Sequence, residues 1–174
     1  MKTVVRFLIA VGVVFTAVLL ATSCDDDDKD NQTTIIGNWK IAQTEVTVTP
    51  LATATLSKEQ LEAAVANYVL FPVNSRVVFT NDAVTFAPSI NGADPESMTC
   101  QYVLNKDVLS IVLPLSQAPS VQGDVDLTDN ILKITLSAES FTQLLKTFAK
   151  DDADFKNVVD QISSATVYYR LVRL

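Results

Sequence analysis

The feature that most constrains the fold is a two-residue alternation of apolar and polar side chains, which recurs in several segments between residues 98 and 127. In the first of these segments the more apolar positions are Met98, Cys100, Tyr102 and Leu104. Successive side chains of a β-strand point to opposite faces of its sheet. The alternation therefore predicts strands that each bury one face.

Short runs rich in Asn and Asp separate the strand-like segments, at residues 81–82, 105–107 and 129–130. Asn and Asp tolerate a left-handed backbone and bind turn amides, so each run predicts a hairpin. Strands are expected at residues 35–49, 76–80, 83–87, 98–104, 108–113, 121–127, 131–137 and 165–173. Eight antiparallel strands can close on themselves and leave no unpaired edge. The predicted fold class is mostly β, an antiparallel eight-stranded meander barrel.

The first expected strand changes the face on which its apolar side chains lie. Trp39 and Ile41 share one parity, whereas Val46 and Val48 have the other. One extra residue between the two pairs would restore a common face, so we expect a β-bulge that lets a long strand turn a barrel corner.

Three helices are expected to interrupt the barrel. Residues 57–60 form a capping-box pattern before a helix whose apolar face includes Leu61, Val65 and Tyr68. Residues 140–143 repeat the capping pattern, and Asp152 is the expected cap of a third helix. The apolar positions of these two later helices are Phe141, Leu144, Leu145, Phe148, Phe155, Val158, Val159 and Ile162. One helix thus falls between strands one and two, and a helical pair precedes the last strand.

The N-terminus has the pattern of an export signal. Lys2 and Arg6 precede an uncharged run at residues 7–22, which is typical of a secretory signal. Residues 20–24 place small side chains directly before Cys24 and resemble a bacterial lipobox. The resemblance implies removal of residues 1–23, acylation of Cys24 and anchoring in membrane lipid. The alternative is a secreted protein in which Cys24 has no special role.

Residues 24–33 are expected to form an acidic tether between the lipidated cysteine and a domain at residues 34–174. Four consecutive aspartates at 25–28 repel one another and stay solvated. An acidic run behind the lipidated cysteine resembles the surface-export signal of Bacteroidota-type lipoproteins. It implies a lipid-anchored protein of the bacterial outer membrane that is exposed on the cell surface; the alternative is a spacer on the periplasmic side.

Gly37, Asn38 and Trp39 open the first strand, and Arg170 and Arg173 lie near the end of the chain. With the eight-strand meander, this pattern resembles the lipocalin-like domains of many Bacteroidota lipoproteins. The resemblance implies that Trp39 closes the barrel floor and that Arg170 or Arg173 stacks over it in a cation–π contact. The alternative is a core tryptophan in another α+β sheet.

Composition argues against several function classes. The chain has 13 basic and 20 acidic residues and no His, so its net charge of −7 repels nucleic acid. Without His, catalytic triads and His-ligated metals are excluded, and we expect no enzyme, metal or cofactor. Strand alternation explains Asp124 and Asp126 better than a calcium site with Asp129 and Asn130 does. Cys100 is expected to be a buried, unreactive thiol.

Two functions remain open for the domain. The inward positions are mostly aliphatic and aromatic, so a hollow barrel would bind a small apolar or aromatic ligand. Its opening is expected near the loop that carries the helix at residues 57–69. The alternative is a surface interaction module with a packed core, which contacts a cell-envelope protein or glycan.

Overall fold

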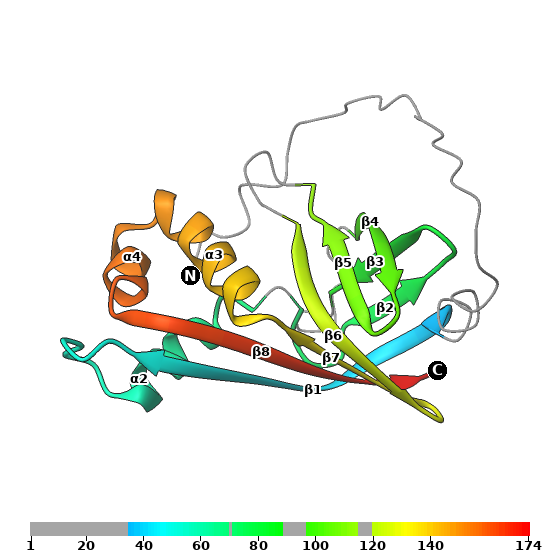
Figure 1. Ribbon diagram of the computed structural model, residues 1–174, viewed down its shortest axis with the longest axis horizontal. Helices are drawn as coiled ribbons and strands as arrows, with labels where there is room; N and C mark the ends of the chain where they lie inside the picture. The colour runs from blue at the N-terminus through cyan, green and yellow to red at the C-terminus, as the bar shows by residue number, and fades with distance from the viewer. Residues whose placement is uncertain (1–34, 70, 89–96, 115–119) are drawn as a thin grey trace.

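A computed structural model describes residues 35–69, 71–88, 97–114 and 120–174 (Figure 1). Eight antiparallel strands close into a barrel in sequence order, and the last strand pairs with the first. The strands are β1 (Gly37–Pro50), β2 (Arg76–Phe79), β3 (Ala83–Ala87), β4 (Met98–Asn105), β5 (Val108–Val112), β6 (Val121–Thr128), β7 (Ile131–Leu136) and β8 (Ile162–Arg173). The predicted fold class is confirmed, and the bounds of β2 to β7 agree with the prediction within one residue.

The first and last strands differ from the prediction. β1 begins at Gly37 rather than residue 35, because side chains of the barrel bind the carbonyl oxygens of Ile35 and Ile36 in place of a neighbouring strand. β8 begins at Ile162 rather than residue 165, and Ile162 was wrongly assigned to the preceding helix. Its pairing with Pro50 at the end of β1 draws it into the sheet.

The predicted bulge in β1 is confirmed. The pairing of β1 with β8 shifts register between Ile41 and Gln43. Trp39 and Ile41 are buried before the shift, and Val48 is buried after it, on the opposite sequence parity. One long strand therefore keeps its apolar side chains on the inner face around a corner.

Three helices pack beside the barrel: α2 (Lys58–Ala66), α3 (Ala138–Phe148) and α4 (Ala153–Val159), with a 3-10 turn η2 (Ala149–Asp151) between the last two. Ser57 caps α2 through the complete capping box, and Asp152 caps α4, as predicted. The predicted cap of α3 was wrong: Ser137 accepts the hydrogen bond of the Ser140 amide, so the helix begins one turn earlier.

The halves of β1 and β8 that lie beyond the small barrel strands form a long two-stranded ribbon (Figure 1). Helix α2 packs against β1, and α3 packs against β8 and β6. In Figure 1, α2 lies beside β1 and the α3–α4 pair lies beside β8, and α2 also contacts α4. The short hairpins β2–β3, β4–β5 and β6–β7 all turn at the other end of the barrel, where β8 ends.

Candidate functional site

Trp39 lies buried at the end of the barrel that carries the short hairpins, which we call the closed end. The indole is fully buried, and its Nε1 donates to the carbonyl oxygen of Ile35 at 2.8 Å. The guanidinium of Arg173 lies over the ring, with Cζ 4.5 Å from the centroid, and Nη1 donates to the carbonyl of Ile36 at 3.4 Å. Both side chains therefore hold the chain segment that leads into β1.

The contact between Arg173 and the Trp39 ring requires a glycine at position 37. The φ of Gly37 is +140°, a backbone conformation that L side chains rarely adopt, and an added Cβ would lie 3.2 Å from Nη1 of Arg173. The Gly-x-Trp pattern thus has a physical basis: glycine makes room for the guanidinium, and the tryptophan two residues later supports it.

Of the two arginines expected near Trp39, the structure brings only Arg173 to the ring. Along β8 the buried side chains are those with odd numbers from Ala165 to Leu171. Arg173 continues this inner parity, whereas Arg170 has the outer parity and lies between Gln43 of β1 and Lys133 of β7 in the register. The stacking role expected of Arg170 is therefore wrong, because its side chain starts on the outer face.

An apolar cavity of about 20 Å³ lies inside the barrel toward the opposite end, where α2 connects to β2. Its walls include Ile41, Phe71, Phe86, Ile111, Leu136 and Tyr169. This volume holds about one water molecule. The side chains that line this cavity therefore nearly fill this part of the barrel interior.

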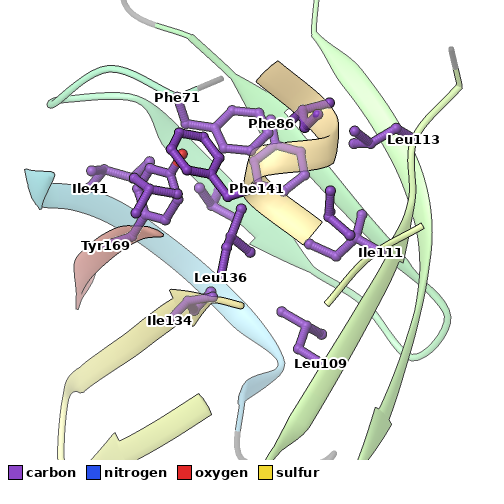
Figure 2. Packing of buried hydrophobic residues seen from close by; sticks show 14 of the residues in the cluster. Ile41, Phe71, Phe86, Leu109, Ile111, Leu113, Ile134, Leu136, Phe141 and Tyr169 are labelled. Atoms are coloured by element: carbon purple, nitrogen blue, oxygen red, sulfur yellow. The ribbon is translucent and has the colours of Figure 1, made fainter. Parts of the chain in front are cut away.

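Among the described residues that line the cavity, Phe71 comes from the α2–β2 connection, Leu113 directly follows β5, and the others lie on strands. The Phe71 ring stacks on Phe86 with centroids 3.7 Å apart and an interplanar angle of 9°. It also lies 6.1 Å from the Tyr169 ring in a tilted arrangement. Figure 2 shows these three rings gathered together at one side of the core. A loop thus places an aromatic ring inside the barrel.

The position of this loop depends on β1. The Asn74 amide donates to the Ile41 carbonyl at 2.8 Å, and the Ile41 amide donates to the Ser75 carbonyl at 2.9 Å. Asn74 itself has a left-handed backbone with φ 76°. These bonds attach residues 74–75 to β1 immediately before its bulge.

Three hydroxyl groups in this region are buried and have no hydrogen-bond partner within the described residues: those of Thr44, Ser75 and Tyr169. Tyr169 is 4% exposed and Ser75 is fully buried. Burial strongly raises the pKa of Tyr169, so its phenol stays neutral. An unpaired buried hydroxyl costs about 1–3 kcal/mol, so such a group needs an explanation.

The chemistry of Cys100 is limited by its surroundings. The thiol lies on the inner face of β4 and is buried, as predicted. Burial raises the pKa of Cys100 to about 11, so very little nucleophilic thiolate exists at neutral pH.

The turn that follows α2 is joined to α4 by an aromatic contact outside the cavity. Tyr68 stacks on Phe155 with centroids 3.5 Å apart, and its hydroxyl donates to Asp152 at 2.7 Å. Burial, and then the Asp152 carboxylate, raise the pKa of Tyr68 to about 12. The contact fixes the start of the α2–β2 connection, which continues to Phe71.

The remaining sequence-predicted residues lie elsewhere. Cys24 and the tether lie outside the described residues. Asp124 and Asp126 are exposed, and Asp126 binds Nζ of Lys133 at 2.8 Å. Within the described ranges, no three His, Cys, Asp or Glu residues are grouped as metal ligands. No helix in the same ranges is long and apolar enough to cross a membrane.

Sequence reasoning missed Phe71, Thr44, Ser75 and Tyr169 as site residues. A ring in a connection shows no periodicity, so no pattern marks Phe71. The inner parity of Tyr169 is visible in the sequence of the last strand, but its lack of a partner depends on which side chains surround it.

The strand order and the contacts at the closed end define a β-barrel of lipocalin-like architecture. The chain matches no protein-family profile, no curated protein and no solved structure.

Proposed function

We propose that this protein is an exported lipoprotein whose barrel binds one small apolar or aromatic ligand. The observation that carries the proposal is the position of Phe71, whose ring lies inside the barrel and stacks on Phe86 at 3.7 Å. The ring comes from a connection rather than from the barrel wall. It can therefore leave the interior without breaking the pairing between strands.

The space that Phe71 occupies has the properties of an aromatic binding site. Phe86 offers one stacking face and Tyr169 a tilted ring at 6.1 Å, while Ile111 and Leu136 supply aliphatic wall. Removal of one benzene-sized ring would add its volume to the existing cavity of about 20 Å³. Apolar cavities of about 150 Å³ bind benzene, so an opened site of this kind accepts a ligand of one ring.

Binding of toluene to the purified domain tests this proposal by NMR. We expect toluene to shift the ring resonances of Phe71 and Phe86 in the wild-type protein, because the ligand replaces one ring by another. Phe71→Ala should bind toluene more tightly, since no side chain has to leave. Phe79→Ala is the matched control, because Phe79 is an equally buried ring toward the closed end. In Phe79→Ala, toluene should shift the Phe86 resonances by the same amount as in the wild-type protein.

A second outcome would favour a different function. If toluene at its solubility limit leaves the wild-type resonances of Phe71 and Phe86 unchanged, and protein recovered from native membranes carries no small molecule, ligand binding is refuted. The small cavity volume then favours a packed module that contacts a cell-envelope protein or glycan through its surface.

The location of the protein is part of the proposal and has its own test. We propose that Cys24 is acylated, that residues 1–23 are removed and that the domain lies on the outer-membrane surface behind the acidic tether. Mass spectrometry of the N-terminal peptide should find a diacylglyceryl-modified Cys24, and an unmodified thiol would refute the anchor. Protease added to intact cells should remove the domain if it is on the surface and spare it if it faces the periplasm.

A further inference from the structure

Three unpartnered hydroxyls lie along one part of the barrel wall, and they bear on which ligand the proposed site would take. Thr44 and Tyr169 are register partners on β1 and β8. Both have the inner parity of their strands, and the oxygen atoms of both are buried without a partner among the described residues. Thr44 and Tyr169 thus lie on neighbouring strands with both side chains on the inner face.

The third hydroxyl belongs to the loop that carries Phe71. Ser75 is bound to Ile41 through its backbone carbonyl, and Ile41 precedes Thr44 on β1 across the bulge. Ser75 also has the same parity as the buried Val77 of β2, so its side chain starts toward the interior. Ser75 and Thr44 are therefore buried near this part of β1, but of the three hydroxyl residues only Tyr169 lines the cavity.

The direction of the Tyr169 side chain connects these hydroxyls to the aromatic site. Figure 2 shows the Tyr169 ring directed toward Phe71, with its oxygen at the end nearest the stacked Phe71 and Phe86 rings. A ligand ring that replaced Phe71 would therefore lie next to a buried donor. Phe71 itself has no polar atom with which to bind it.

We propose that the Tyr169 hydroxyl is a polar recognition group of the site, so that the ligand is an aromatic ring that carries an uncharged hydroxyl or carbonyl group. This inference rests on the proposed ligand-binding function. Phe71 marks the position of the ligand ring, and the tyrosine hydroxyl marks the position of its polar substituent.

The ligand is expected to be uncharged because the residues that line the cavity are uncharged. None of the described residues around the cavity carries a charge, and the Tyr169 phenol stays neutral. A carboxylate or an ammonium group would lose its hydration there without gaining a counter-charge, which is strongly unfavourable. Hydroxyl and carbonyl groups lose less hydration and can bind the Tyr169 hydroxyl.

A pair of probes with nearly the same shape tests this inference. Phenol and toluene differ in one hydroxyl or methyl group, and phenol is neutral at pH 7. In the Phe71→Ala protein we expect phenol to bind about threefold to tenfold more tightly than toluene, the range that one net hydrogen bond gives. In Phe71→Ala/Tyr169→Phe this preference should disappear, because the Tyr169 hydroxyl that would bind the phenol oxygen is lost.

The controls separate the inference from the function on which it rests. Phe71→Ala/Tyr102→Phe removes a hydroxyl that already binds the Thr80 carbonyl at 2.6 Å, so the preference for phenol should remain. If toluene binds but phenol shows no preference, or if the preference survives Tyr169→Phe, the polar recognition is refuted and ligand binding stands. If wild-type protein and Phe71→Ala bind neither probe, the proposed function fails.

Discussion

Replacing Tyr169 with Phe removes one oxygen atom from the core, and in the ligand-free protein this change should increase stability. The Tyr169 ring is 4% exposed, and its hydroxyl has no partner in the described part of the chain. A buried hydroxyl without a hydrogen bond costs about 1–3 kcal/mol relative to a solvated one. Phenylalanine keeps the ring and its contacts with Phe71. We expect the free energy of unfolding to rise by about 1 kcal/mol.

The same substitution at Tyr102 provides a matched control. Tyr102 is also 4% exposed and also lies on the inner face of its strand, but its hydroxyl donates to the Thr80 carbonyl at 2.6 Å. Loss of one such bond costs about 0.5–1.5 kcal/mol. Tyr102→Phe should therefore destabilise the domain by about 1 kcal/mol, so the two variants should differ by about 2 kcal/mol.

Urea unfolding followed by circular dichroism measures both variants. The midpoints should move in opposite directions while the slope of the unfolding free energy against urea stays constant. In thermal melts, a domain of this size should shift by about 3–5 °C for each kcal/mol. If Tyr169→Phe destabilises the domain as much as Tyr102→Phe does, the Tyr169 hydroxyl has a partner, and the argument from an unpaired group is refuted.

Three further predictions concern the rest of the barrel. Trp39→Ala should destabilise the domain by about 3–5 kcal/mol, because the indole is fully buried; an unchanged thermal melt would contradict its role at the closed end. Gly123→Ala should cost about 1–3 kcal/mol, since its Cβ would lie 2.6 Å from the Thr135 carbonyl oxygen, and urea unfolding that shows no loss would contradict this close approach. The Phe155 amide in the first turn of α4, followed by the Tyr68 hydroxyl, lowers the pKa of Asp152 below its unfolded value near 3.8. The stabilisation is therefore present above that value and decreases as pH falls through the folded pKa, so acid unfolding of Asp152→Asn should lack this step, and an unchanged pH profile would contradict it.

The sequence alone predicts those parts of the fold that repeat along the chain. The parity change between Ile41 and Val46 predicts the bulge, because side chains alternate in any strand and a common inner face requires one extra residue. The capping box at Ser57 predicts the start of α2, since it depends on residues within one helical turn. These features are local, and they are confirmed.

The parts that could not be predicted depend on partners distant in sequence. Two serines compete to cap α3, and the Ser140 hydroxyl instead accepts the Gln122 amide of β6, which leaves the cap to Ser137. The choice of Arg173 over Arg170 follows from the exact parity of β8 against its neighbours. The position of Phe71 inside the barrel depends on backbone bonds between its loop and β1, which no periodicity encodes.

The seam between β1 and β8 has a consequence for the order of folding. It joins residues from the two ends of the domain, and it is the longest strand pairing in the barrel. Contacts between residues far apart in sequence form late, because a long loop must close before they contribute any stability. A chain that is still emerging from the ribosome therefore lacks the strand that closes its barrel until β8 has been synthesised. Such delayed closure would favour the proposed export, since it keeps the domain from completing its fold too early.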